Sequence, residues 1–294
     1  MRITHRWQFN EAIRRMGAGQ SAMADAQRRL ATGKAFDRPS ADPIGMSQAM
    51  ELRSALRVKE QAATNAADGE MWVNVADAKL QTVSERLQRA KELAVTGASF
   101  ASATEQQAIA IEVAEIRDQL VEIANAQHQG RRIFGGFGAG APVTNVAGTW
   151  TFTGDTGAVM RRIDDDETVQ VNVTADDVFG FNAGNDIFTV LDDFETAALA
   201  GDQAAMGAAI ADIDAALERN LGALARLGSA GRRIDAAQDR FLDEINTLRS
   251  QLTQIEDVDI SEAVMDLKLR ESAYQTTLAV FARSAQASLV DFLR

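Results

Sequence analysis

The stretch from residue 210 to the C-terminus limits most strictly what this chain can fold into. Mainly apolar or small residues recur there at alternating steps of three and four over about six heptads, a period typical of a helix that packs along a partner helix. The positions are Ile210, Ile213, Leu217, Asn220, Leu224, Leu227, Gly231, Ile234, Gln238, Phe241, Ile245, Leu248, Leu252 and Ile255. The segment contains no proline. A helix of ~45 residues is ~70 Å long, so it needs a partner helix rather than a compact core.

A second run begins after a break at 257–259. Asp259, with Glu262 three residues later, predicts an N-cap with a capping partner. The run consists of Ile260, Val264, Leu267, Glu271, Tyr274, Leu278, Phe281, Ala285, Ser288 and Phe292, with Leu289 among its last residues. A similar seam near the N-terminus consists of Phe9, Ile13, Met16, Gln20, Met23, Gln27 and Leu30. Both ends of the chain are therefore predicted to be long helices.

Turn-forming residues separate these ends from the middle of the chain. Gly33 is a typical C-cap residue, and an extended connector with Arg38 and Pro39 follows. Asp42 before Pro43 predicts the N-cap and first residue of a second helix that reaches about Ala98. Arg38 and Asp42 fit two roles equally well, as turn residues or as contacts between subunits.

Two further helical seams are predicted in the middle of the chain. The first consists of Trp72, Ala76, Leu80, Val83, Leu87, Ala90 and Ala94, and the second, capped by Thr104 and closed by Gly130, consists of Ile109, Val113, Ile116, Leu120, Ile123 and Gln127. Beyond the breaker cluster that contains Gly135 and Gly136, residues 150–153, 159–163 and 169–173 alternate like strands. Asn185-Asp186 is then predicted to cap a short helix whose buried face consists of Ile187, Leu191, Phe194 and Ala198.

These elements predict a mainly α fold, with long antiparallel coiled-coil helices from both termini and a small β-rich insert. Three domains are expected: a terminal coiled coil of residues 1–33 and 259–294, a helical core of 34–134 and 185–258, and the insert of 135–184. Gly135 and Gly136 are expected to form a hinge, because the glycine run does not match a phosphate-binding G-x-G-x-x-G pattern.

Composition and motifs exclude several classes of function. The formal net charge of -12 argues against nucleic-acid binding, and the absence of cysteine excludes disulfides and thiolate chemistry. The first residues lack the apolar segment of a secretory signal, and no apolar run is long enough for a membrane span. The acidic run 164–167 lacks EF-hand spacing and is expected to be a solvated turn, and neither His5 nor His128 belongs to a recognisable triad. No catalytic, cofactor-binding or metal site is predicted, and the chain is not expected to be an enzyme.

The terminal seams have no local partner, although pairing the two end helices in antiparallel fashion would bury both seams. Burying such a seam contributes on the order of ten kcal/mol. Ordering ~55 backbone residues costs ~1–2 kcal/mol each, which is far more. The terminal pair is therefore expected to be marginal or disordered in the monomer and to become ordered when neighbouring copies cover it. The stretch 210–255 is instead expected to be intramolecular core.

Several motifs resemble the flagellin family, and within it the subgroup that joins the flagellar hook to the filament. Residues 30–34 (LATGK) followed by 38–43 (RPSADP) resemble the N-terminal signature of the family, and 87–95 (LQRAKELAV) resemble its first long-helix block. Residues 130–136 (GRRIFGG) and the ending 285–293 (AQASLVDFL) are more similar to the junction subgroup than to filament flagellins. The motifs recur in order over nearly the whole chain.

The resemblance implies a structural role in the bacterial flagellum, with terminal helices in an inner tube and the insert facing outward. It implies a ring of like subunits, with hook-associated protein 1 on the hook side and flagellin and the filament cap protein on the other. It also implies secretion by type III export without a cleaved signal peptide, after an export chaperone has held the C-terminal helix. Two alternatives stay open: a short filament flagellin, and a non-flagellar coiled-coil scaffold or surface binding module.

Overall fold

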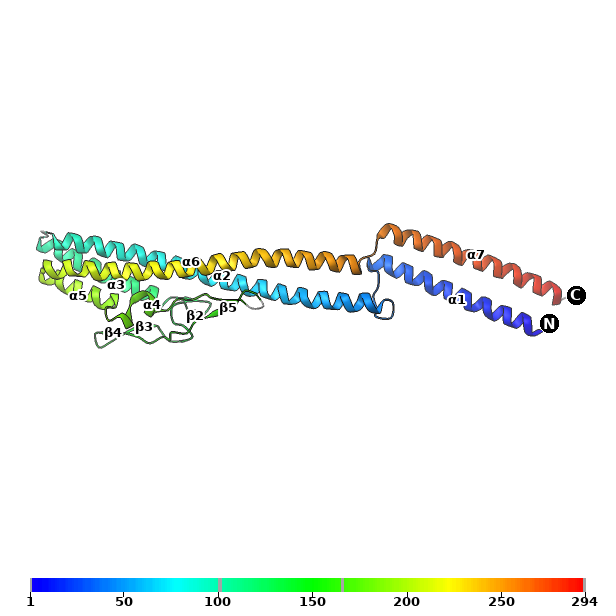
Figure 1. Cartoon of the computed structure of the whole chain (residues 1–294), viewed down its shortest axis with the longest axis horizontal. Coiled ribbons are helices and arrows are strands. Elements are labelled where there is room, and N and C mark those ends of the chain that lie inside the picture. The colour runs from blue at the N-terminus through cyan, green and yellow to red at the C-terminus, as the bar shows by residue number, and fades with distance from the viewer. Residues whose placement is uncertain (1, 100–101, 165–166, 293–294) are drawn as a thin grey trace. The chain divides into compact units, whose positions relative to one another are not determined.

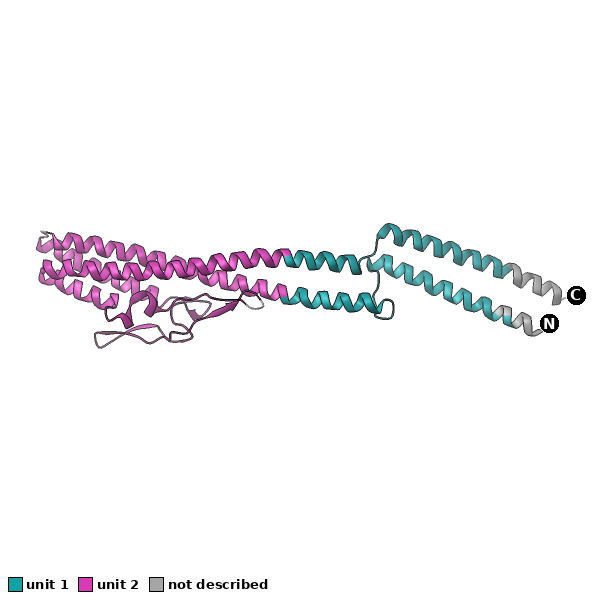
Figure 2. Ribbon diagram, in the orientation of Figure 1, with its two compact units in different colours: residues 1–58, 244–294 teal, residues 59–243 magenta. Residues whose placement is uncertain are grey.

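The computed structural model describes the backbone of residues 2–99, 102–164 and 167–292, and the side chains of these except 2–6, 8, 9 and 283–292. The chain divides into two compact units (Figure 2). Unit 1 comprises residues 1–58 and 244–294, and unit 2 comprises residues 59–243. The mainly α fold predicted from the sequence is confirmed, whereas the expected division into three domains stays a prediction.

Unit 1 contains the two terminal helices, α1 (Arg2–Thr32) and α7 (Ile260–Phe292), which lie side by side and antiparallel (Figure 1). The first part of α2 (Pro43–Ala98) and the last part of α6 (Gln203–Glu256) complete it. The predicted end of α1 at Gly33 and the predicted start of α2 at Asp42 are confirmed. Gly33 has a φ of +69° and closes α1 through a 2.9 Å bond from its amide to the Arg29 carbonyl. Asp42 caps α2 through the amides of Ile44 and Gly45, at 3.1 and 2.9 Å.

The bundle of unit 2 consists of α3 (Ala103–Ala124), α5 (Ile187–Ala200) and the remaining parts of α2 and α6. Every predicted seam residue of α2 is buried, and so are the predicted faces of α3 and α5, except for Gln127. Gln127 lies beyond the end of α3, in a short strand, and is exposed. The prediction of a helix closed by Gly130 is therefore wrong. The physical reason is Asn125, whose side-chain amide pairs with the backbone of Val143 through bonds of 2.9 and 3.0 Å and so directs the chain into the insert.

The predicted cap of α3 also needs correction. Ser102, not Thr104, is the N-cap. Its hydroxyl accepts a bond from the Glu105 amide, while the Glu105 carboxylate accepts one from the Ser102 amide at 2.7 Å. These reciprocal bonds form a capping box and lower the pKa of Glu105, mainly through the Ser102 amide.

The buried stripe of α6 is rotated relative to the predicted one. The series that includes Ile213, Asn220 and Leu227 is buried as predicted, but the series that starts at Ile210 is mostly half-buried. In its place an alanine series is buried, which consists of Ala209, Ala216, Ala223, Ala230 and Ala237. Alanines at heptad spacing allow neighbouring helices to approach closely. One of the two buried series of α6 therefore consists of small residues.

Asn220 is a fully buried polar residue in that interface. Its side-chain amide donates to the Leu80 carbonyl at 2.9 Å and to the Ser84 hydroxyl at 2.6 Å, both on α2. A buried asparagine in a helix seam favours the one register in which its bonds are made. Asn220 therefore specifies the alignment of α6 with α2.

The described residues between α3 and α5 form three small antiparallel sheets, of which the first precedes the insert and the other two belong to it. They pair β1 (Gln127–His128) with β2 (Arg131–Arg132), β3 (Val143–Val146) with β4 (Thr149–Phe152), and β5 (Met160–Arg162) with β6 (Thr168–Gln170). A short helix, α4 (Ala175–Phe179), and a 3-10 turn, η1 (Phe181–Ala183), lead into α5. The three predicted strands correspond approximately to β4, β5 and β6.

Aromatic side chains form the core between the insert and α5. The Phe188 ring of α5 is fully buried, and its centroid lies 5.3 Å from that of Trp150, 5.1 Å from Phe179 and 5.8 Å from Phe181. Phe152 stacks on Phe181 at 6.0 Å. Because each two-stranded sheet is too small to be stable alone, packing of this cluster on α5 contributes to the stability of the insert.

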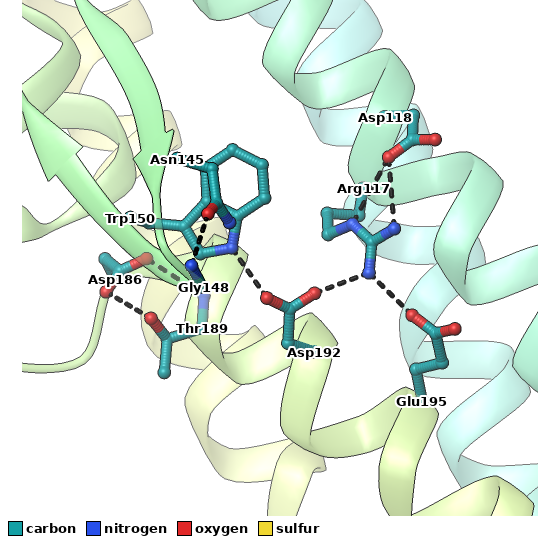
Figure 3. A network of polar contacts seen from close by, with 9 residues as sticks. All are labelled: Arg117, Asp118, Asn145, Gly148, Trp150, Asp186, Thr189, Asp192 and Glu195. Atoms are coloured by element: carbon teal, nitrogen blue, oxygen red, sulfur yellow. Dashed lines mark hydrogen bonds and ion pairs between the residues drawn. The ribbon is translucent and has the colours of Figure 1, made fainter.

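A polar network fastens the β3–β4 hairpin to the bundle (Figure 3). The Trp150 indole donates to Asp192 of α5 at 2.6 Å. The Arg117 guanidinium of α3 donates to the same carboxylate at 2.5 Å and to Glu195 at 2.6 Å. Burial lowers the pKa of Arg117, but the bonds and charges of these carboxylates outweigh it and raise that pKa above its usual value. Asp192 therefore joins three elements.

Asp192→Ala is expected to lower the free energy of unfolding by about 2 kcal/mol, because it leaves Trp150 without its acceptor and removes one partner of Arg117. The neighbouring Asp193 is exposed, so Asp193→Ala makes the same chemical change at a matched helix position and is expected to have little effect. Urea unfolding followed by tryptophan emission measures both. Equal losses in the two variants would show that the network adds nothing.

Candidate assembly surface

The predicted assembly residues lie on α1 and α7 of unit 1, and the two helices cover them only in part. The half-buried ones are Met16, Met23, Leu30, Val264, Leu267, Tyr274 and Phe281, and the exposed ones are Ile13, Ile260 and Leu278. Phe9, Leu289 and Phe292 lie outside the described side chains. Among the side chains that the structure describes on these helices, only Ala26 and Ala263 are buried. The pair therefore has almost no core of its own.

Further apolar side chains on α7 are exposed although no seam predicted them. Met265, Leu269 and Val280 are 65%, 69% and 62% exposed, and Trp7 of α1 is 63% exposed. The heptad analysis counted one stripe per helix and so missed this second face. Large exposed apolar surfaces on a soluble chain mark sites of interaction with other chains. A helix that is apolar on more than one face is suited to contact several neighbours.

The connector between α1 and α2 holds the other predicted residues. Pro43 is the first residue of α2 and Asp42 is its cap, so Asp42 has a turn role within the subunit. The Arg38 guanidinium donates to Asp25 of α1 at 2.9 Å and stays half exposed, and Pro39 is exposed beside it. A role of these residues in contacts between subunits stays a prediction.

Gly135 and Gly136 are buried in a tight turn at the start of the insert. Gly136 has a φ of +65°, and a Cβ there would lie 2.4 Å from the Asp155 carbonyl oxygen. The Asp155 carboxylate also accepts bonds from the amides of Phe137 and Gly157, at 2.9 and 2.7 Å. Glycine is thus required by close packing and by backbone conformation. The hinge function stays a prediction.

The other polar groups considered in the sequence are the acidic run 164–167 and the two histidines. Asp165 and Asp166 lie outside the described residues, and the flanking Glu167 pairs with Arg233 at 2.8 Å. The side chain of His5 is also outside the described set, whereas His128 packs edge-on against Trp72. Within the described residues, no cluster of three or more His, Cys, Asp or Glu side chains could hold a metal ion. None of the helices searched there is long and apolar enough to cross a membrane.

Terminal helices with uncovered apolar faces, joined to a helical bundle that carries an insert, define a structural protein built to associate with other chains. Two family models identify its family. The bacterial flagellin N-terminal helical region matches residues 3–139, and the bacterial flagellin C-terminal helical region matches residues 207–293. Together the two matches span both helical ends of the chain. Most of the insert and α5 lie between them. The chain belongs to the flagellin family.

Curated relatives match over the whole chain. Flagellin FlaB2 of Treponema pallidum is 26% identical over 301 residues, which cover 100% of both chains. Flagellar hook-associated protein 3 of Salmonella typhimurium is 24% identical over 318 residues, again 100% of both chains. Filament proteins and a hook-associated protein are thus about equally similar in sequence.

Solved structures show the same fold. A flagellar hook-associated protein from Vibrio parahaemolyticus, described as putative in its own name, has a TM-score of 0.70 at 19% identity and covers 74% of this chain and 100% of its own. FlgL of Bacillus cereus has a TM-score of 0.60 at 23% identity, and the match covers 69% of this chain and 99% of the FlgL chain. Both solved chains are covered almost completely, so the shared fold extends over their full length.

Proposed function

We propose that this chain is the structural subunit that joins the flagellar hook to the filament. Its membership of the flagellin family makes it a structural component of the bacterial flagellum. The single observation that supports assembly is the uncovered apolar surface of α1 and α7. Support for the junction comes from the full-length similarity to a hook-associated protein 3, from the structural similarity to hook-associated proteins, and from the sequence of residues 130–136.

Several parts of the proposal concern partners and location. The subunits form a ring with hook-associated protein 1 on the hook side and flagellin or the filament cap protein on the other. An export chaperone binds the C-terminal helix before type III export, and no signal peptide is cleaved. The chain has a mechanical rather than a catalytic role. An intact-mass measurement on subunits recovered from flagella tests whether a signal peptide is cleaved, because cleavage would lower the mass.

The number of copies per flagellum separates the junction role from the filament role. If the chain is a junction protein, quantitative mass spectrometry of sheared, purified flagella will find it as a trace component beside an abundant filament protein. If it is the bulk protein of that preparation, the alternative of a short filament flagellin replaces our proposal. Its absence from the flagella would instead favour a scaffold or binding module elsewhere.

A further inference from the structure

The two connectors of unit 1, residues 33–42 between α1 and α2 and residues 257–259 between α6 and α7, are bonded to each other close to the end of α1 and the start of α7. The Ala35 amide donates to the Glu256 carbonyl at 2.6 Å, and the Val258 amide donates to the Gly33 carbonyl at 3.0 Å. These two bonds form a short antiparallel bridge between Lys34 and Asp257. We call this bridge, together with the side chains of Lys34, Arg53 and Glu256, the connector latch.

Glu256 is the centre of the connector latch. It is the last residue of α6 and is only 3% exposed. One carboxylate oxygen accepts a bond from Arg53 of α2 at 2.8 Å and lies 3.2 Å from the Lys34 ammonium, while the other has no hydrogen-bond partner among the described atoms. Lys34 also donates to Asp257 at 2.6 Å. A cation from each of two other segments therefore converges on a single buried carboxylate.

This arrangement conflicts with the local preference of α6. A negative charge at a helix C-terminus is unfavourable, because the helix dipole is negative there. A buried carboxylate is also costly unless it is paired. Both costs are offset only when Lys34 and Arg53 are in place. Such a conflict between local preference and tertiary structure points to a functional position.

Apolar packing supports the same region. Phe36 is buried, and a Cβ at Gly45 of α2 would lie 2.8 Å from its ring. Ala26 of α1 and Ala263 of α7, the only buried side chains described on those helices, lie toward the connector ends of their helices. Among the described side chains of α1 and α7, the buried ones thus lie near the connectors.

We propose that Glu256 is a positioning residue that draws Lys34 and Arg53 together and thereby fixes the direction in which α1 and α7 leave the ends of α2 and α6. Both connectors are then held in one geometry before any neighbouring copy binds. The consequence for assembly rests on the proposed function: every subunit would present its terminal pair to its neighbours in the same direction. The connector latch itself is a property of the single chain.

The absence of cysteine makes a direct test possible. Gln27 of α1 and Ser250 of α6 are exposed, so Gln27→Cys and Ser250→Cys introduce two labelling sites for spin labels. Pulsed electron resonance on the full-length monomer then measures the distance distribution between them. The wild-type background is expected to give one narrow distribution. Glu256→Ala is expected to broaden it, and Glu256→Gln, which keeps the shape but not the charge, is expected to broaden it less.

Hydrogen exchange at the Ala35 and Val258 amides gives a second, local measurement. Their protection is expected to fall at least about tenfold in Glu256→Ala, since removing one partner of a buried ion pair destabilises its surroundings strongly. Glu51 is an exposed carboxylate on the same part of α2, and the control variant Glu51→Gln is expected to change neither measurement. Unchanged protection in the α2–α6 seam of unit 2 shows that a variant is still folded.

The outcomes distinguish the connector latch from the proposed function. A broad distribution in the wild type, or a Glu256→Ala variant that behaves like Glu51→Gln, would overturn the latch and leave the junction role untouched. If Glu256→Ala opens the connectors but enters flagella as the wild type does, the positioning role is overturned. A wild-type chain that is missing from flagella would overturn the proposed function, whatever the distances are.

Discussion

The double variant Leu267→Asp, Tyr274→Asp is expected to abolish incorporation into flagella while unit 2 stays folded. Both side chains are half-buried on α7 in the single chain, so each aspartate can reach water in the monomer. When neighbouring copies cover the seam, the same charges become buried without partners. Each buried, unpaired charge costs several kcal/mol, and 1.4 kcal/mol corresponds to a factor of ten in an equilibrium constant, so incorporation should fall by a factor of about a hundred or more.

The measurement compares the amount of subunit in purified flagella with the amount in the medium, in cells that lack the wild-type chain. Asn74→Asp with Gln88→Asp adds the same charge at exposed polar positions of α2 in unit 2, and this control is expected to assemble far better. Incorporation of the Leu267→Asp, Tyr274→Asp chain at the level of the control would mean that this seam is not an assembly surface.

Phe188→Ala is expected to lower the free energy of unfolding of unit 2 by about 3–5 kcal/mol, the usual cost of removing a buried phenylalanine. The ring is fully buried and contacts aromatic rings from three other elements of the insert. Because these rings pack the insert onto α5, the contacts between the insert and α5 should loosen first. We therefore expect the variant to lose tryptophan emission from Trp150 at a lower urea concentration.

A Trp7→Phe background restricts the emission to Trp72 and Trp150, which both lie in unit 2. Phe137 is 63% exposed, so Phe137→Ala makes the same change outside the core and should cost less than about 1 kcal/mol. If Phe188→Ala costs no more than Phe137→Ala, the aromatic cluster is not what stabilises the insert.

Periodicity was sufficient to predict the long helices, because few folds other than a coiled coil can satisfy an uninterrupted run of heptads. Most helix ends could also be predicted, because Gly33, Asp42 and Asp259 form hydrogen bonds with backbone groups a few residues away. Periodicity failed for one side of α6. Counting large apolar residues favoured the series that starts at Ile210, whereas the buried series consists of alanines. Alanine is compatible with buried and exposed helix positions alike, so its role depends on how close the facing helix lies.

Tertiary contacts explain the other differences. The end of α3 depends on the pairing of Asn125 with Val143, which lies eighteen positions further along the chain. Strand β3 pairs with β4 through a tight turn at Ala147 and Gly148, both with positive φ, and its short sequence resembles a loop. The connector latch could not be predicted either, because Lys34 and Glu256 are far apart in sequence and no spacing pattern connects them. By contrast, the spacing of apolar residues was enough to predict that α1 and α7 are helices, whereas the role of their seams in assembly stays a prediction.

The most direct test of the account is hydrogen exchange on dilute, monomeric chain. We propose that the apolar faces of α1 and α7 are covered mainly by other copies, because their own subunit covers them only in part. We therefore expect the amides of residues 10–25 and 264–281 to be protected at least about a hundredfold less than those of the α2–α6 seam in unit 2, because local stability follows buried contacts. Protection in these two segments equal to that of the unit 2 seam would contradict this proposal.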